Sequence, residues 1–574
     1  MLAALLLLQP SGLLKLVGLH EQAEKIQVQF LTHSRWVLLQ AIISGLVVIW
    51  LGVGLLLHSL TSVLASLSLV VRLGIAEACT IVGGLVRQVQ VAPLPLQAAL
   101  LGLFTLLVGS QTYQAAFFPL SYDEIWTYLN FSSRGPLVAL AYYPAPNNHV
   151  LYSLLSSLTV LLAPESALGL RLPAIIASGL AFWLLFALLL RHSALLWALC
   201  GLFLFYSSYI VFYYSFLARG YEFQLLAFIG SLGAVMELRN PHSRYRTAAW
   251  LGFIIFSTIG LTTIPTYVYP LVSEFLFLGL VLFTLGPAKE WLRILQKMLL
   301  VGMLIASITV LFYAPILIFS GPARLFNNKF VIPIERSEVL RLLIHHLRDT
   351  LDWFFISSLT QYLLIVLAAL SLFAAAVKPK SISRMWQLGL FFVLPALFML
   401  FQAVIPFPRT WIYLMVVLVL LICCLPTFGT WDWARQQPKL VSYGLLLSAI
   451  SIWTVSTYLN QARFHSEHDD FFSYSQVYTQ VLDVAPNRQL LIESDHADVM
   501  LEYQYRLHHR PYTPLRAHTG QLPAQVWLVE DKRTALSEVL RSDSTGCSRT
   551  IYDDTFVRVR EIIAPAINFN PLFK

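Results

Sequence analysis

The sequence contains little charge. Only 12% of its 574 residues are Asp, Glu, Lys or Arg, while 57% are hydrophobic. Soluble domains have roughly 25% charged residues, so this composition excludes a soluble globular protein. Many apolar runs have the length of about 20 residues that a membrane-spanning helix needs. They lack the two-residue alternation of strands, so they predict a helical membrane protein rather than a barrel.

Cysteine is also scarce, with five residues and no CxxC or Cys/His spacing. This argues against a zinc site and a disulfide framework. The net charge of +8 is small for the length. In a membrane protein such an excess reflects cytoplasmic loops and anionic lipid, so we expect membrane lipid as a partner and no nucleic acid. The start of the chain has no basic segment before its apolar run, which favours an in-plane or buried segment over a cleaved signal.

The apolar runs predict roughly 13 transmembrane helices. We expect them at 37–58, 62–86, 97–117, 167–190, 194–216, 221–237, 247–264, 268–286, 297–319, 352–376, 385–404, 411–428 and 440–458. Basic loops at 239–246, 288–297, 378–384 and 433–439 are placed in the cytoplasm by the excess of positive charge there. The alternate loops, and everything after residue 459, then lie on the extracytoplasmic side.

One further apolar stretch, "NNHVLYSLLSSLTVLL" at 147–162, does not fit this alternation. As a span it would place the Arg and His at 191–192 outside, and its 16 residues are few for a crossing. We therefore expect a helix that lies at the outer surface or dips partway in.

The predicted fold class is an all-α polytopic membrane protein with a small C-terminal α/β extracytoplasmic domain. Residues 1–92 form an N-terminal extension with two extra spans, and 93–459 form the main transmembrane domain, with external loops at 118–166 and 321–351. Residues 460–574 are polar and charged. Their pattern predicts helices at 472–484, 496–507 and 533–541 and strands at 489–494, 525–530 and 555–562.

Polar residues collect on the predicted outer side of the membrane. They include Asp123, Glu124, His149, Arg219, Tyr221, Arg409 and Tyr413. An ionisable group in lipid costs roughly 2.5–3.5 kcal/mol, so such groups usually line a cavity. This mixture suits the transfer of a sugar from a polyprenyl phosphate. A carboxylate can act as base or metal ligand, arginines can bind phosphate, and aromatic rings can stack on a sugar.

Five motifs follow one another along the chain. They are "SYDEIW" (121–126), "PNNHVLYSLL" (146–155), "LGLRLPAIIASGLAFWLL" (168–185), "YYSFLARGYEFQLL" (213–226) and "FPRTWIYL" (407–414). Their order resembles that of the GT-C superfamily of membrane glycosyltransferases, which includes protein O-mannosyltransferases and bacterial aminoarabinose transferases. The resemblance covers about residues 100–460. The family commonly has Pro-Pro or Lys-Pro where this chain has "PNNH", and His149 stands in there.

The resemblance implies an integral-membrane glycosyltransferase of the cell envelope, in a bacterial inner membrane. It would transfer a sugar from a polyprenyl-phosphate carrier to an extracytoplasmic acceptor, which is a protein, a lipid or a glycan. Asp123 and Glu124 would be the catalytic residues, and Asp123 would be the ligand of a divalent metal, Mg or Mn. The implied substrate-binding residues are His149, Arg171, Arg219, Tyr221, Arg409 and Tyr413.

Simpler roles exist for several of these residues. Asp123 and Glu124 could be acids in the first turn of a surface helix. Arg171 could extend to the lipid headgroups from a span end, and the i,i+4 pair Arg409 and Tyr413 could anchor a helix at the interface.

Other functions and sites are also open. A transporter or lipid flippase and a non-catalytic scaffold are the alternative functions. The tail motif "ESDHAD" (493–498) resembles a metal site, but helix capping by Asp495 explains it as well.

Overall fold

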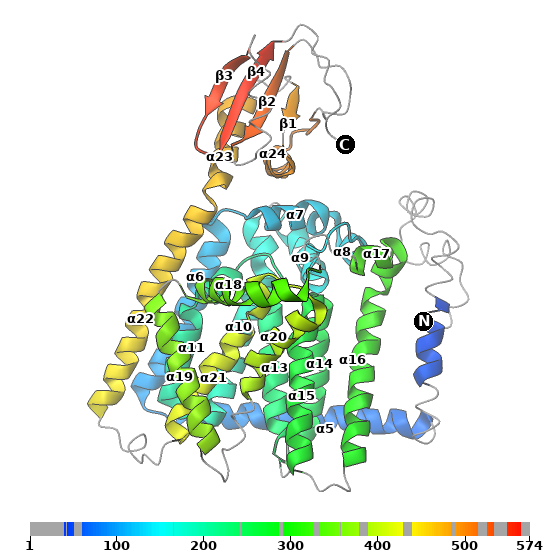
Figure 1. Ribbon diagram of the computed structural model, residues 1–574, viewed down its shortest axis with the longest axis vertical. Helices are drawn as coiled ribbons and strands as arrows, with labels where there is room; N and C mark the ends of the chain where they lie inside the picture. Colours follow the sequence, from blue (N-terminus) through cyan, green and yellow to red (C-terminus); the bar gives the residue numbers. More distant parts are fainter. Residues whose placement is uncertain are drawn as a thin grey trace.

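The structure is a computed structural model. It describes residues 40–41, 43–50, 60–164, 166–240, 243–285, 291–326, 333–355, 358–377, 388–428, 439–483, 489–492, 494–514, 525–532 and 548–563. Figure 1 shows a bundle of helices with a small domain of strands and helices at one end, which we call the domain end. The predicted fold class, a helical membrane protein with a C-terminal α/β domain, is confirmed.

The upright helices of the bundle correspond to the expected spans. They are α6 (Leu94–Phe117), α10 (Ala167–His192), α11 (Leu195–Ser207), α13 (Tyr221–Leu238), α14 (Arg246–Thr263), α15 (Val268–Leu285), α16 (Trp291–Phe319), α19 (Ser358–Val377), α20 (Leu390–Gln402), α21 (Leu414–Phe428) and α22 (Lys439–Glu467). In the described part of the chain, six helices are long and apolar enough to cross a membrane, and several apolar helices are shorter. Helix α13 packs against α10, α14 and α15, and almost all of its side chains are buried.

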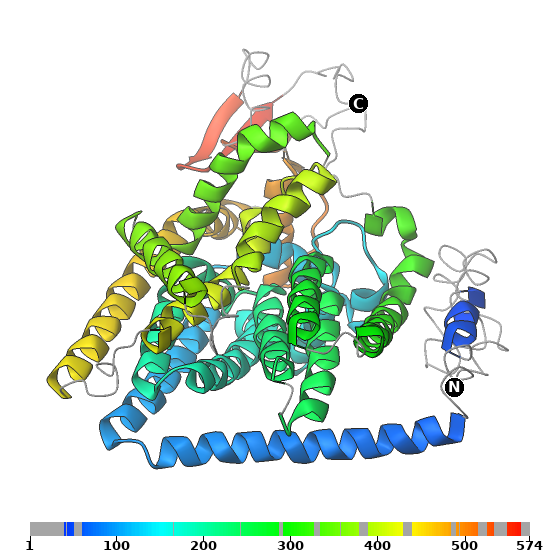
Figure 2. The same ribbon diagram turned by 60° about the horizontal axis from the view of Figure 1, so that its bottom comes forward.

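Helix α5 (Leu60–Gln90) differs from the expected upright span at 62–86. Figures 1 and 2 show it lying across the end of the bundle opposite the domain end. A stretch of it is long and apolar enough to span. However, Glu77 inside this stretch accepts a hydrogen bond from the backbone N–H of Ala248, at the start of α14, at 2.8 Å. The other expected N-terminal span lies mostly outside the described residues, which are helical at 43–50.

The first external loop forms short elements at the domain end. These are α7 (Tyr122–Asn130), the 3-10 helix η1 (Ser132–Arg134), α8 (Pro136–Ala141) and α9 (Val150–Leu162). Helix α9 has 13 residues. At 1.5 Å per residue it is about 20 Å long, too short for a hydrocarbon core of about 30 Å, as the sequence predicted.

Further short elements surround the same end of the bundle. Helix α12 (Tyr209–Tyr214) follows α11 after a break at Ser208, and α17 (Pro322–Phe326) and α18 (Arg336–Phe354) form the second external loop. The 3-10 helices η2 (Pro265–Tyr267) and η5 (Pro408–Trp411) precede α15 and α21. Figure 1 shows α18 lying crosswise in front of the bundle.

The C-terminal domain follows α22. The expected boundary at residue 460 falls inside this helix, which continues to Glu467. The domain contains α23 (Asp469–Val477), the π-helix η7 (Tyr478–Leu482), β1 (Leu490–Ile492), α24 (Asp495–Leu507), β2 (Gln525–Asp531), β3 (Ser548–Asp553) and β4 (Val557–Ile563).

Its four strands form one sheet in the order β1-β2-β4-β3. Strand β1 is parallel to β2, and the other neighbours are antiparallel. Strand β3 was not predicted, because "SRTIYD" is short and only two of its six residues are apolar or aromatic. The expected helix at 533–541 lies outside the described residues.

The domain sits against α7. The rings of Tyr128 on α7 and Tyr503 on α24 meet edge to face at 5.8 Å, and Arg506 lies over the Tyr128 ring at 5.5 Å. The C-terminal domain therefore packs against α7 of the predicted first external loop.

Candidate active site

Helix α7 starts with a capping box. Ser121 accepts a hydrogen bond from the N–H of Glu124, and the Glu124 side chain accepts one from the N–H of Ser121. This cap fixes the first turn, in which Asp123 lies next to Glu124. The two carboxylates lie in different environments, since the Asp123 side chain is 37% exposed and Glu124 is 0% exposed.

Glu124 forms a buried ion pair with Arg171 of α10. Both side chains are 0% exposed, and two guanidinium nitrogens donate to the carboxylate at 2.7 Å each. The same guanidinium also donates to the backbone carbonyls of Phe118 and Pro119, at 3.0 and 2.8 Å, just after α6. Burial alone would raise the pKa of Glu124, but the charge and hydrogen bonds of Arg171 hold it below its ordinary value.

The pair also reaches the loop before α13. The backbone N–H of Ala218 donates to Glu124 at 2.7 Å. Asp123 directly precedes Glu124 in the chain, and Arg219 directly follows Ala218. We predicted catalysis for Glu124 and substrate binding for Arg171. Their complete burial places them behind the site, where they hold Asp123 and Arg219 in position.

Arg219 lies beside both Asp123 and the "PNNH" motif. One guanidinium nitrogen is 3.4 Å from Asp123 Oδ2, and the other donates to the side chain of Asn147. Gly220 allows this close approach, since a Cβ there would lie 2.7 Å from Nδ1 of His149. The two motifs are therefore packed directly against each other.

His149 is buried behind the site. Its ring meets Tyr221 edge to face at 5.1 Å, and its Nδ1 is buried without a hydrogen-bond partner among the described residues. Burial, together with the charges of Arg219 and Arg409, holds the pKa of His149 well below its ordinary value. The imidazole is therefore neutral at physiological pH.

Arg409 comes from η5 and faces Asp123 from the other side. A guanidinium nitrogen is 3.9 Å from Asp123 Oδ2. The guanidinium lies over the rings of Phe407 and Tyr221, at 4.5 and 5.8 Å. Its Nε is buried and has no hydrogen-bond partner among the described residues. Arg409 therefore has donor capacity that Asp123 does not use.

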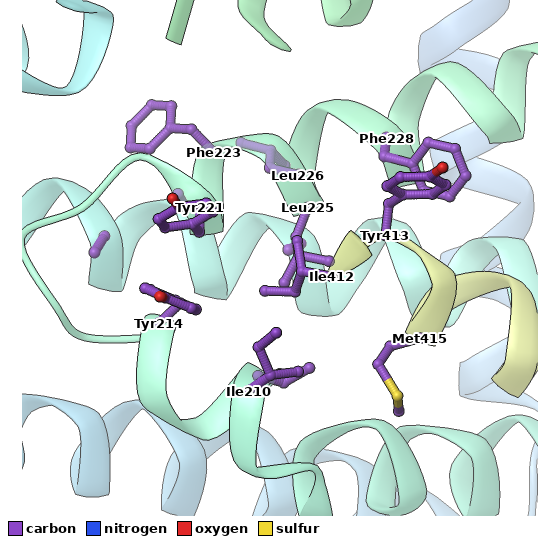
Figure 3. Packing of buried hydrophobic residues seen from close by; sticks show 14 of the residues in the cluster. Ile210, Tyr214, Tyr221, Phe223, Leu225, Leu226, Phe228, Ile412, Tyr413 and Met415 are labelled. Carbon is purple, nitrogen blue, oxygen red and sulfur yellow. The ribbon is translucent and has the colours of Figure 1, made fainter. Parts of the chain in front are cut away.

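Tyr413 is placed in the apolar core. It is 0% exposed, and its ring packs 5.1 Å from that of Phe228, as Figure 3 shows. Tyr221 is also buried, against Tyr214 at 4.3 Å. Tyr413 and Arg409 are four residues apart, yet the 3-10 turn of η5 separates their directions. Of the six predicted substrate-binding residues, only Arg219 and Arg409 line the cavity described next.

A cavity of about 250 Å³ lies at this point, between the bundle and the C-terminal domain. The bundle contributes Ser121, Tyr122, Asp123, Tyr213, Tyr214, Leu217, Arg219, Trp353 and Arg409. The lining also includes Glu467 at the end of α22, and His468, Asp470 and His496 from the C-terminal domain that follows it. An anionic or sugar-bearing ligand placed here would meet a carboxylate, two guanidinium groups and several aromatic rings.

The donor set at Asp123 does not fit a divalent metal held by the protein. Such a cation needs several oxygen or nitrogen ligands. Among the residues that the structure describes, no group of three His, Cys, Asp or Glu side chains could hold one. Asp123 is instead flanked by two cationic side chains. The Mg or Mn site stays a prediction, and no step below uses it.

Among the polar residues at or beside the cavity, Asn147, which contacts Arg219, and Asp470 and His496, which line the cavity, were absent from the predicted site. Asn147 precedes His149 in a motif that the sequence singled out. Asp470 and His496 belong to the C-terminal segment, where "ESDHAD" gave the only signal. We explained that motif by capping through Asp495, whereas Ser494 is the N-cap of α24. Nothing local in the sequence indicates that this segment faces Asp123.

The chain is similar in fold to solved structures of ArnT from Cupriavidus metallidurans. The structure of ArnT bound to undecaprenyl phosphate superposes with a TM-score of 0.54 at 12% identity, covering 82% of this chain and 99% of that chain. The apo structure gives 0.55 at 11% identity, covering 81% and 98%. No protein-family model and no curated protein sequence matches the chain. The comparison shows that the chain has the fold of these ArnT structures.

Proposed function

We propose that this protein is an integral-membrane glycosyltransferase that transfers a sugar from a polyprenyl-phosphate carrier to an extracytoplasmic acceptor. The observation that carries the proposal is the cavity with Asp123, Arg219 and Arg409, in which Asp123 Oδ2 lies 3.4 and 3.9 Å from the two guanidinium groups. An ArnT structure of the same fold has been solved with undecaprenyl phosphate. The basic loops that the sequence assigns to the cytoplasm support an extracytoplasmic site in a bacterial inner membrane.

The proposed reaction is one displacement at the anomeric carbon. Asp123 accepts the proton of the acceptor hydroxyl, and the hydroxyl oxygen forms a bond to that carbon. The bond from the carbon to the phosphate oxygen breaks, and its electron pair leaves with the polyprenyl phosphate. Arg219 and Arg409 neutralise the phosphate as it leaves, since guanidinium groups bind phosphate through paired hydrogen bonds. Such a displacement inverts the configuration at the anomeric carbon.

The carrier half of this proposal is tested by binding of undecaprenyl phosphate to the purified protein in detergent. We expect Arg219→Ala and Arg409→Ala each to weaken binding about 10-fold or more, the loss of a charge-assisted hydrogen bond. Arg324→Ala, which removes an exposed arginine of α17 at the same end, is the matched control and should bind like the wild type. Absence of wild-type binding, or equal binding by all variants, would remove the proposal.

The catalytic half is tested with Asp123→Asn. We expect this variant to bind undecaprenyl phosphate and to lose sugar transfer by about 100-fold or more, the usual contribution of a general base. The readout is mass spectrometry of envelope glycans from a deletion strain complemented with either form. Full restoration of the glycans by the variant would exclude Asp123 as the base.

A further inference from the structure

The cavity has a second polar wall, which the proposed reaction does not use. It is built by the C-terminal segment and contains Asp470 at the start of α23 and His496 at the start of α24. His496 Nε2 lies 2.9 Å from Asp470 Oδ2. The sequence placed both residues outside the catalytic part of the chain, and no part of the mechanism above accounts for them.

The imidazole of His496 lines the same cavity as the Asp123 carboxylate. It stacks on the ring of Tyr122 at 4.8 Å with an interplanar angle of 17°. Tyr122 directly precedes Asp123 in the first turn of α7. Burial, followed by the charges of Asp495, Asp123 and Asp498, raises the pKa of Tyr122 to about 12, so its ring is that of a neutral phenol. The stack therefore joins the C-terminal wall to the turn that carries Asp123.

The pair leaves one ring nitrogen available. The Asp470 carboxylate is 10% exposed and accepts a hydrogen bond from Nε2–H, which assigns the proton to that nitrogen. In the neutral imidazole Nδ1 then has a lone pair, and within the described residues it has no hydrogen-bond partner. The His496 side chain is 26% exposed, so a molecule in the cavity can reach it. A nitrogen of this kind accepts a hydrogen bond from a hydroxyl group.

We infer that Asp470 and His496 form the acceptor subsite of the proposed transferase and that the acceptor is a hydroxyl-bearing carbohydrate. The inference rests on the proposed function. His496 accepts the hydrogen bond of an acceptor hydroxyl, and Asp470 fixes the ring and its tautomer. The guanidinium groups of the bundle bind the carrier phosphate on the other wall. Donor and acceptor thus enter from opposite walls and meet at Asp123.

The rest of the lining favours a sugar over a lipid chain. Tyr122, Tyr213 and Trp353 line the same cavity as the polar pair. Aromatic rings beside paired hydrogen-bonding groups bind the apolar face and the hydroxyls of a sugar at once. A lipid chain would leave the carboxylate and imidazole unsatisfied, at a cost in free energy.

Docking of the domain does not by itself explain the pair. Tyr503 and Arg506 of α24 already contact Tyr128 of α7. The two roles also differ in what they predict, because loss of a docking contact lowers stability and carrier binding together.

The test uses the full-length protein in detergent with saturating undecaprenyl phosphate. The probes are fluorescently labelled oligosaccharides released from the envelope of the producing cell, and binding is measured by fluorescence polarisation. We expect the wild type to bind at least one of them. His496→Ala and Asp470→Asn should each weaken that binding about 10-fold or more. Their affinity for undecaprenyl phosphate and their melting temperature should stay at the wild-type values.

Matched controls exist in the same domain. His508 stacks on Tyr478 at 4.5 Å, away from the cavity, and Asp469 is the exposed neighbour of Asp470. His508→Ala and Asp469→Asn should bind the oligosaccharide like the wild type. Equal losses in these controls would overturn the inference.

Other outcomes separate the two proposals. Carrier binding without any oligosaccharide binding, or full oligosaccharide binding by both variants, would overturn the subsite alone. Binding of a Ser- and Thr-rich peptide in place of the oligosaccharides would overturn the carbohydrate assignment. If His496→Ala lowered both the melting temperature and the affinity for undecaprenyl phosphate, His496 would instead serve to dock the C-terminal domain. Oligosaccharide binding that depends on His496 without carrier binding would remove the proposed function and keep the subsite.

Discussion

At the scale of single residues, the site depends on two neighbouring carboxylates with opposite environments. Glu124 is buried and accepts hydrogen bonds from Ser121, Arg171 and Ala218. Asp123 is partly exposed and lies 3.4 and 3.9 Å from its two arginines. Loose contacts of an exposed group contribute little to stability, about 0–1 kcal/mol. Breaking a buried pair costs far more, because it leaves an uncompensated charge. One residue therefore serves the fold and the other is available for chemistry.

This difference predicts opposite responses to similar substitutions. Glu124→Gln should destabilise the protein by about 3–5 kcal/mol, since Arg171 keeps its charge without a buried partner. Asp123→Asn should change the stability by less than about 1 kcal/mol. Thermal melting in detergent measures both. A double variant, Glu124→Leu with Arg171→Met, removes both charges and should melt above Glu124→Gln. Equal melting of the two single variants would contradict the assignment.

His149 predicts a pH dependence of stability. Burial lowers its folded-state pKa well below 6.5, so below about pH 6.5 the unfolded chain binds a proton that the folded chain does not. The contribution of neutral His149 to the free energy of unfolding is therefore fully present above pH 6.5. It is lost as the pH falls towards the pKa of His149 in the folded protein. At about pH 5 the loss is up to roughly 2 kcal/mol. Melting curves at about pH 5 and pH 7.5 should differ less for His149→Gln than for the wild type.

At the scale of elements, short helices rather than spans place the reactive groups. Asp123 lies on α7, Arg409 on η5 and His496 on α24. Helix α18 supports η5, because Trp411 Nε1 donates to His346 Nε2 at 2.8 Å. Both side chains are buried. The crosswise helix of the second external loop therefore helps to hold Arg409 in the cavity.

Removing this support should affect Arg409 indirectly. Trp411→Phe keeps the aromatic ring and loses the N–H, which costs about 0.5–1.5 kcal/mol of stability and leaves His346 without its donor. We expect a several-fold loss of undecaprenyl phosphate affinity. In an Arg409→Ala background the same change should have no further effect on affinity, and independent, additive losses would show that the contact does not act through Arg409.

The order and side of the motifs sufficed to predict Asp123, Arg219 and Arg409, which the structure brings together. The sequence did not separate Asp123 from Glu124, because adjacent positions give no measure of burial. Nor did it show that Tyr413 points into the core, since the i,i+4 spacing assumed a regular helix where η5 is a 3-10 turn. Asp470 and His496 depend on how a separate domain docks. That is a property of distant surfaces, and a local pattern does not contain it.

At the scale of the whole molecule, all the proposed chemistry lies at one end of the bundle. A transporter places its binding site near the middle of the membrane, between related halves. Here Asp123, Arg219 and Arg409 share a cavity that is bordered by the C-terminal domain. The arrangement therefore suits a reaction at the membrane surface better than passage through the membrane.

The proposed orientation predicts which cysteines react from outside the cell. Asp469 at the domain end and Arg244 at the opposite end are both exposed. In a background with Cys79→Ser and Cys547→Ser, a membrane-impermeant maleimide added to spheroplasts should label Asp469→Cys and not Arg244→Cys. Lysis should make both reactive, which controls for accessibility. Labelling of Arg244→Cys in intact spheroplasts would invert the topology.

The buried pair of Glu124 and Arg171 has a consequence for how proteins of this fold can diverge. The pair holds Glu124, next to Asp123, and Ala218, next to Arg219. One buried interaction therefore positions both the proposed base and one of the arginines proposed to bind phosphate. The rim of the cavity, made by other elements and by a separate domain, can accept new residues and new specificities while the reacting groups keep their spacing. Chemistry and substrate range are thus free to evolve on separate parts of the chain.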